Sequence, residues 1–313
     1  MSIFSNFFKK EAPLLGSQGL GGGLGFLAGR GAAEYLDATG GTIFEIGDYR
    51  WHIINSSSPP QSIAINQVAS DPNDSVIDFL VVAGGGGAGG GDNAYGGGGG
   101  AGGVIFRPGK PITTTGGPYP VTIGSGGSGL PIDNTNPGGQ PSTDGSDTVI
   151  GSSPDPIYFI AKGGGGGASG SGYQFGTGGR NGGSGGGGGD GWPSGAGSGG
   201  TGNKVTDSAT DSTPGQGNNG ASGATPNDGG GGGGGALSAA SGAAGGNGVA
   251  ISITGSSVTY SKGGNGQGST ANGGTPATLT NYGEGGNAKY GNGVAATGGT
   301  GANGIVIIRY LTP

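Results

Sequence analysis

Short apolar segments alternate with glycine tracts along most of this chain, and residues 41–83 carry the clearest β pattern. There the apolar positions alternate with polar ones or form short runs rich in β-branched and aromatic residues. This pattern is typical of β-strands, and it predicts strands at 42–45, 49–55, 62–66 and 76–83. The last is the longest apolar run in the chain, so we expect a buried central strand there.

Residues 84–303 form a glycine-rich body. Glycine tracts recur at 84–91, 96–100, 163–167, 185–189 and 229–235. Strand-like segments separate some of them, at 104–106, 121–123, 148–150, 157–161, 249–253 and 258–260, and 305–311 predicts a last strand. Flexible glycine linkers lack such apolar segments, so the pattern favours an ordered body.

Composition changes the expected nature of the core. The chain has 90 Gly and 18 Pro in 313 residues, a share that without a period normally indicates disorder. Collagen's strict Gly-X-Y period is absent. Apolar residues make up 30% of the chain, too few to order it through side chains alone.

Extended polyglycine offers another kind of core. Like the polyproline II helix it has three residues per turn and no internal hydrogen bonds, so neighbouring helices must satisfy each other's N–H and C=O groups. Six neighbours can surround each helix where no Cβ holds them apart. We predict a mostly β and irregular fold with almost no α-helix: a small N-terminal β region and a body of packed polyglycine II helices and short strands.

Three regions follow from these patterns: an N-terminal segment at 1–40, a β region at 41–83 and a glycine-rich domain at 84–313 that a strand at 304–311 closes. Phenylalanines in 2–10 lie near helical spacing. This segment is either an unstructured leader or an anchor that docks on another protein. The candidate anchor residues are Phe4, Phe7, Phe8, Leu14 and Leu15.

Little in the sequence supports catalysis or cofactor binding. There is no cysteine and one histidine, and the net charge of −6 argues against binding nucleic acid or an anionic membrane. No apolar run is long enough to span a bilayer. The match to a dinucleotide motif at 84–91 lacks the helix that must follow, and a calcium-type match at 185–192 has no tandem copies. We interpret His52 as structural, and Asp144 and Asp147 as turn residues. We expect no enzyme activity, no catalytic or cofactor-binding residue and no metal site.

Aromatic residues between the glycine tracts are the candidate contact residues. They either cap the ends of the glycine helices or bind a receptor from loops on a rigid scaffold. The polar insertion at 203–219 is another candidate loop. The aromatic candidates are Tyr95, Tyr173, Phe175, Trp192, Tyr282 and Tyr290.

Residues 79–87, the segment 120–127 and the ending 301–310 together resemble the glycine-rich domain of phage tail-fibre and related virion proteins. The opening 1–15 is similar to virion structural proteins of marine cyanophages. The resemblance implies an adhesin without catalytic residues, on the virion surface after assembly in the host cytoplasm. Its implied partners are other virion proteins, through the N-terminal segment, and a bacterial surface glycan or outer-membrane protein.

Two other functions remain open at this point. A non-adhesive decoration or connector protein of the capsid, neck or baseplate would use the same domain. Ice binding by a flat polyglycine II face would need a regular Gly-X-X repeat, which is absent. The sequence leaves the oligomeric state open between a trimer and a monomer.

Overall fold

The computed structural model describes residues 34–92, 94–130, 140–170, 176–191, 195–203, 216–224, 229–268, 281–291 and 296–312. Glu34–Pro313 forms one compact unit, so the predicted β region and glycine-rich body share one fold. The candidate anchor residues, Phe4, Phe7, Phe8, Leu14 and Leu15, lie outside the described residues. In the described ranges there is no α-helix, and no helix could cross a membrane.

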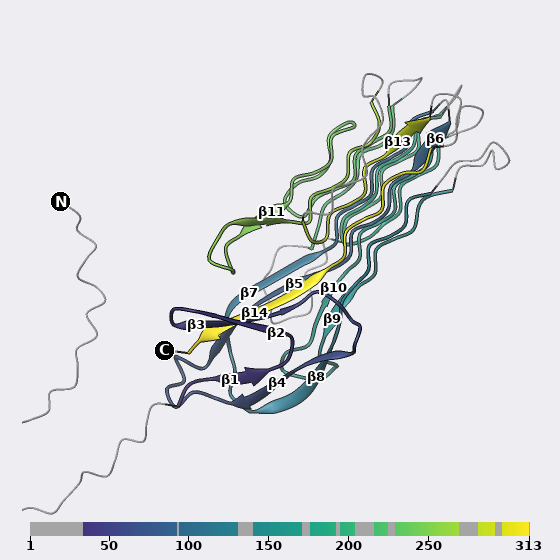
Figure 1. Cartoon of the computed structure of the whole chain (residues 1–313). Coiled ribbons are helices and arrows are strands. Elements are labelled where there is room, and N and C mark those ends of the chain that lie inside the picture. Colours follow the sequence, from purple (N-terminus) through teal and green to yellow (C-terminus); the bar gives the residue numbers. More distant parts are fainter. Residues whose placement is uncertain are drawn as a thin grey trace, which may run out of the picture. The chain divides into compact units, whose positions relative to one another are not determined.

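Two five-stranded antiparallel sheets occupy one end of this unit, which we call the sheet end (Figure 1). The first sheet has the order β1 (Asp37–Thr39), β4 (Gln61–Gln67), β8 (Gly116–Thr122), β9 (Thr148–Ile150) and β10 (Phe159–Ala161). The second has the order β2 (Thr42–Ile46), β3 (Tyr49–Ile54), β14 (Ile305–Leu311), β5 (Val76–Val82) and β7 (Val104–Pro111).

Two further strand pairs lie outside the five-stranded sheets. An antiparallel pair joins β11 (Val249–Ile251) to β12 (Val258–Tyr260), and a parallel pair joins β6 (Gly90–Asp92) to β13 (Lys289–Gly291). Each strand predicted from the sequence is confirmed within a few residues, and β5 is the buried inner strand expected there. Three short strands, β1, β6 and β13, were not predicted.

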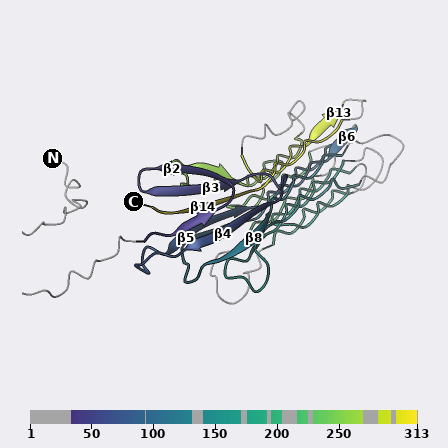
Figure 2. The ribbon, with the colours of Figure 1, turned by 60° about the horizontal axis from the view of Figure 1, so that its bottom comes forward.

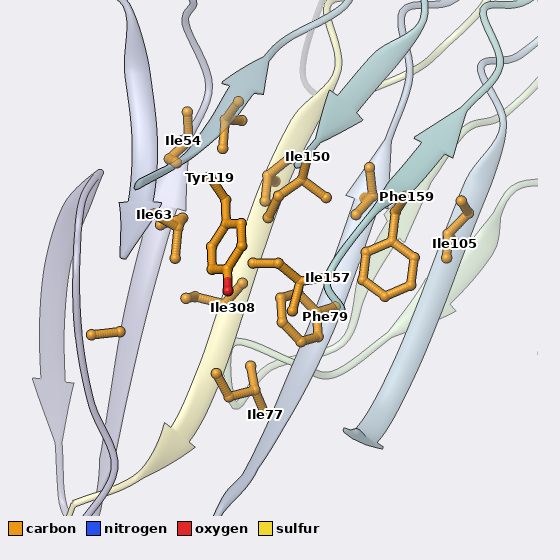
Figure 3. Packing of buried hydrophobic residues seen from close by; sticks show 14 of the residues in the cluster. Ile54, Ile63, Ile77, Phe79, Ile105, Tyr119, Ile150, Ile157, Phe159 and Ile308 are labelled. Atoms are coloured by element: carbon orange, nitrogen blue, oxygen red, sulfur yellow. The ribbon is translucent and has the colours of Figure 1, made fainter. Parts of the chain in front are cut away.

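Apolar side chains from both sheets meet between them in one cluster, which we call the sandwich core (Figure 3). Strand β5 shows how the alternation of a strand supplies two clusters. Phe79 and Val81 point into the sandwich core, whereas Leu80 and Val82 point to the opposite face of the second sheet. There they form a second cluster with Trp51 and Ile307, which the β11–β12 hairpin covers with Ile253 and Tyr260.

Many strands continue directly into extended glycine segments that lie side by side (Figures 1 and 2). Hydrogen bonds define these segments, which we call the lattice, at 84–89, 96–103, 124–130, 142–147, 163–170, 176–181, 184–190, 197–203, 217–223, 230–235, 244–248, 263–267, 283–288 and 298–303. A strand and a polyglycine II helix have a similar rise per residue. The chain therefore passes from one to the other without a turn.

The first lattice helix shows how the segments are joined. Its successive N–H groups, from Gly84 to Gly89, donate in turn to the segments 143–146, 299–302 and 97–100. Donors three residues apart therefore bond to the same segment. These bonds are 2.8–3.1 Å long. A return to the same neighbour every three residues is the period of a helix with three residues per turn.

The carbonyl groups of this helix serve three further neighbours. They accept N–H bonds from the segments 127–130, 164–170 and 286–289. Donor and acceptor neighbours together are six, so the predicted packing of polyglycine II helices is confirmed. The neighbours that accept run antiparallel to the helix, and those that donate run parallel to it.

Close packing explains the glycine, position by position. A Cβ placed on Gly85, Gly86 or Gly99 would lie closer than 3.0 Å to a backbone carbonyl of a neighbouring helix. The expected absence of Cβ atoms between packed helices does not hold at every inward position, however. Ala88 and Ala101 are fully buried inside the lattice with their N–H bonds intact at 2.9 and 3.0 Å.

Outer helices of the lattice expose about every third residue, and polar side chains there replace the missing backbone partners. Asp144 Oδ1 accepts the N–H of Gly166 at 2.9 Å, and Asp147 Oδ1 accepts the N–H of Gly163 at 2.8 Å. The same carboxylates pair with Arg180 and Lys162. Both aspartates are structural, but they line the edge of the lattice and not turns, which corrects the sequence interpretation.

Candidate functional site

The end of the lattice remote from the sheets, which we call the distal end, is where most helices of the lattice are connected. Figures 1 and 2 show β6 and β13 at this end. Backbone bonds place the ends of several helices around them: Gly170 donates to Gly90, and Gly298 donates to Leu130. The residues that flank the connections 131–139, 171–175, 192–194, 225–228 and 292–295 therefore gather at the distal end.

Two of the candidate aromatic residues meet at the distal end. Tyr95 follows β6, and Tyr290 lies in β13, opposite Gly91 of β6. Their rings stack with centroids 5.1 Å apart and an angle of 25° between the planes. Both side chains are half-buried, so one part of each ring packs on the lattice and another part faces solvent.

The remaining candidates do not all share this place. Tyr282 lies at the sheet end, where its ring packs against the cluster of Trp51 and Leu80, and its hydroxyl accepts a hydrogen bond from Asn55 Nδ2 at 3.3 Å. Tyr173, Phe175 and Trp192 lie outside the described residues. Described residues near them in the chain, Gly170, Gly176 and Asp190, belong to the distal end. Of the three candidates that the structure describes, Tyr95 and Tyr290 lie at the distal end and Tyr282 lies at the sheet end.

The polar insertion at 203–219 starts and ends at the sheet end. The side chain of Gln216 lies beside β10, where its Oε1 accepts the N–H of Lys162 at 2.7 Å and its Nε2 donates to the carbonyl of Ile160 at 2.9 Å. Asn203 donates to Gly182 and Gly183. Residues 204–215 lie outside the described residues, and the two ends of this candidate loop are far along the lattice from Tyr95 and Tyr290.

His52 is fully buried and has two polar contacts. Its Nδ1 lies 2.6 Å from the carbonyl oxygen of Gly40, and its Nε2 lies 3.0 Å from the hydroxyl of Tyr310, on which the imidazole also stacks. A carbonyl oxygen only accepts, so Nδ1–H donates to Gly40. In the neutral imidazole Nε2 then accepts a hydrogen bond from the hydroxyl of Tyr310. Burial lowers the pKa of His52. These contacts support the structural interpretation of this residue.

The glycine tract after β5 does not offer a phosphate cradle. Such a loop binds phosphate through backbone N–H groups that point at the ligand. From Gly84 to Gly89 every N–H donates to a backbone carbonyl of another lattice helix. The calcium-type match at Gly185–Gly189 would need free oxygen ligands, but each of its five carbonyl groups accepts an N–H bond from another lattice segment. The backbone groups of both tracts are thus engaged in the lattice.

One exposed apolar surface was missed from the sequence. The β2–β3 hairpin exposes Ile43, Phe44, Ile46 and Tyr49, at 46%, 49%, 69% and 41% of their surface. A signal was present, since the consecutive residues Ile43 and Phe44 must point to opposite faces of one strand. A strand that is apolar on both faces is either buried on both or has an apolar face left exposed.

A family model described as "Glycine-rich domain" matches residues 63–311, which is more than half of the chain. The chain belongs to this glycine-rich domain family. The match begins within β4 and ends with β14, so the glycine-rich domain contains the lattice and most strands of both sheets. Strands β1, β2 and β3 precede it. No curated protein matches the chain.

Proposed function

We propose that this glycine-rich domain protein is a structural component of a virion, such as part of a tail fibre or another surface appendage, and that its distal end contacts the host cell. The observation that carries the proposal is the separation of two ends by the lattice. Side-chain cores lie at the sheet end, whereas the Tyr95–Tyr290 pair and the described residues that flank several connections gather at the distal end.

The lattice suits this role because its stability does not depend on the connections. Its helices are joined by backbone bonds along their length. Residues in the connections can therefore change without altering a side-chain core. Recognition residues are commonly found on loops that a rigid scaffold positions, and at the distal end the lattice brings the residues that flank several connections close together.

The chemistry of the described pair fits a host-surface ligand. Aromatic rings with one polar tip provide a large contact area, and they are enriched in binding hot spots. The partly exposed rings of Tyr95 and Tyr290 would stack on a sugar ring of a bacterial glycan or pack on an outer-membrane protein. Neither partner requires a cofactor or a metal.

The stacking of the two tyrosines on each other favours one alternative. Two rings that stack on each other could also simply cap the end of the lattice, without binding a receptor. In that case the protein is a non-adhesive decoration or connector of the capsid, neck or baseplate.

Adsorption of virions carrying variants separates the two functions. We expect Tyr95→Ala with Tyr290→Ala to slow adsorption to host cells by more than about tenfold, the effect of a hot spot worth more than ~1.4 kcal/mol. Tyr282→Phe, at the sheet end, is the matched control and leaves adsorption unchanged. Assembled particles that contain the double variant and adsorb at the wild-type rate would assign the pair to a cap and favour the connector.

A further inference from the structure

Strand β2 is the least protected edge of the two five-stranded sheets. Within the described chain it pairs with β3 alone, and all five of its side chains are exposed. An edge strand leaves every second N–H and C=O without a ladder partner, and proteins usually protect such edges with proline, lysine, a bulge or shortness. Strand β2 has five residues, a continuous register and no proline or lysine, and its one charged side chain, Glu45, forms an ion pair with Arg50 of the adjacent strand β3.

The other three edges are all protected. Strand β7 carries Pro108, Lys110 and Pro111, and its register with β5 shifts once. Strand β1 has three residues and a register shift, and β10 has three residues. The contrast within one molecule suggests that β2 is a pairing surface and that the other edges are kept from pairing.

The hairpin turn determines which backbone groups of β2 point outward. Only Gly47 and Asp48 connect Ile46 to Tyr49, and Gly47 has a φ of 62°, which suits the first central position of a type II′ turn. The closing pair of a two-residue turn is hydrogen-bonded. Because hydrogen-bonded pairs alternate in an antiparallel ladder, Phe44 also faces β3, and Ile43 and Glu45 turn their backbone groups outward.

We propose that β2 pairs antiparallel with β2 of a second copy of this chain, about a two-fold axis at Phe44. This register places Ile43 opposite Glu45 of the second copy, so all outward groups of both residues find partners. The strand is self-complementary in this register because no like charges oppose each other. A shift that centres the axis on Glu45 would oppose two carboxylates, and one that centres it on Ile43 would pair fewer residues.

The side chains fit the same arrangement. Phe44 lies opposite its own copy across the axis, and aromatic and β-branched cross-strand pairs are favourable. On the same face Phe44 lies opposite Trp51, and the ring of Tyr49 lies 6.0 Å from that of Trp51. The pairing therefore extends the cluster of Trp51 and Leu80 across the interface. It goes beyond the proposed function and does not depend on it.

The interface is small, so the dimer is expected to be weak. One short strand and its neighbouring hairpin residues cover less than the roughly 800 Å² per partner of a standard interface. We expect a reversible dimer that forms in the micromolar range or above.

Disulfide trapping tests the register, because the chain has no cysteine of its own. In the proposed pair the Cα atoms of the two Phe44 residues are about 4.5 Å apart, within the range that a disulfide spans. Phe44→Cys should therefore give a covalent dimer under mild oxidation of the full chain. Ile46→Cys is the matched control on the same face: it lies opposite Thr42 of the second copy and should give no covalent dimer.

Sedimentation of the untrapped protein tests the interface itself. We expect the wild-type mass to rise toward a dimer with concentration. Ile43→Pro, which removes an outward N–H at a position where an edge strand tolerates proline, should weaken the dimer by more than about tenfold, or ~1.4 kcal/mol. Ile43→Val should not. Phe44→Lys, at a position already exposed, repeats the test should the proline variant fail to fold, and Leu237→Lys is its charge control.

Three results would overturn the proposal: a wild-type protein that stays monomeric at every concentration, a trimer, or a dimer that survives both Ile43→Pro and Phe44→Lys. Pairing of β2 in a monomer with a strand of a different polypeptide would also overturn the proposal, because the partner would not be a second copy of this chain. Equal trapping by Phe44→Cys and Ile46→Cys would contradict the register.

Discussion

The two ends of this protein are ordered by different parts of the same polypeptide. At the sheet end, side chains such as Phe79, Ile150 and Ile308 fill the space between two sheets. In the lattice the space between helices is filled by the backbone itself. A strand in a sheet bonds to a neighbour on each of two sides, whereas the inner lattice helix at 84–89 donates its N–H groups to three neighbours and accepts at its C=O groups from three others.

This difference changes what each region tolerates. A side-chain core accepts exchanges that conserve volume, because rotamers adjust. The lattice has few side chains to adjust, so one carbon added at a tightly packed glycine such as Gly99 meets a carbonyl that belongs to another helix. The lattice in turn places almost no demand on the residues that connect its helices. We infer that this freedom is what makes a glycine lattice useful as a scaffold for variable loops.

The largest expected effect tests the sheet end. Phe79→Ala removes a fully buried ring that contacts Phe159 at a centroid distance of 5.3 Å. We expect it to lower the free energy of unfolding by about 3–5 kcal/mol, measured by denaturant titration. Ile308→Leu, which conserves volume in the same core, should cost less than about 1.5 kcal/mol. If the two substitutions cost the same free energy, the loss of buried volume does not determine the stability of this core.

One carbon atom in the lattice should cost nearly as much. A Cβ on Gly99 would meet the backbone of Gly86 and Gly87 closer than 3.0 Å, so we expect Gly99→Ala to lower the free energy of unfolding by about 1–3 kcal/mol. Gly268→Ala is the matched control, since its Cβ would find nothing nearer than 3.9 Å. Two variants of equal stability would show that the lattice is not held at the spacing described.

A smaller effect is expected at the edge of the lattice. Asp144→Ala leaves the buried N–H of Gly166 without its acceptor and removes the ion pair with Arg180. We expect a loss of about 1 kcal/mol in thermal or chemical unfolding. Asp144→Asn keeps an acceptor oxygen and separates the hydrogen bond from the charge. If both substitutions cost the same, the ion pair carries the effect and the bond to Gly166 does not.

The smallest effect is a pH dependence at the sheet end. The pKa of His52 is lowered mainly by burial, so the unfolded chain binds this proton at a higher pH than the folded chain does. The contribution of His52 to stability is therefore complete above a pH of about 6.5 and falls as the pH drops below that value.

The comparison with His52→Gln isolates this contribution from the carboxylates. We expect the difference in unfolding free energy between wild type and variant to change between neutral pH and mildly acidic pH, with the wild type losing more stability on acidification. A difference that is constant with pH would mean that the folded protein protonates His52 as readily as the unfolded chain does.

The strands and the kind of lattice could be predicted because both are visible in the sequence. Strands appear as apolar segments, and lattice helices appear as glycine tracts. β5 and β14 are apolar apart from Asp78 and Arg309, and the glycine tracts exclude a side-chain core for the glycine-rich body. It could not predict which lattice helices are neighbours, because backbone hydrogen bonds carry no residue-specific signal. The six neighbours of the helix at 84–89 come from segments as distant in the sequence as 299–302.

The candidate site was predicted only in part for the same reason. Tyr95 and Tyr282 look alike in sequence, since both directly precede a glycine and have an asparagine within the two residues before them. Only the direction of each lattice helix separates them, and it places one at the distal end and the other on the cluster of Trp51 and Leu80. The role of Asp144 depends in a similar way on a neighbour that is distant in the sequence.

Amide hydrogen exchange, followed by NMR, tests the central claim most directly, because the claim concerns backbone bonds. In the inner helix at 84–89 every consecutive N–H is bonded, so we expect all six to be protected. In the outer helix at 298–303 the N–H groups of Gly299 and Gly301 are bonded at 2.8 and 2.9 Å, whereas that of Thr300 points outward. The account predicts slow exchange at Gly299 and Gly301 with fast exchange at Thr300; fast exchange throughout 84–89, or no three-residue period at 298–303, would contradict it.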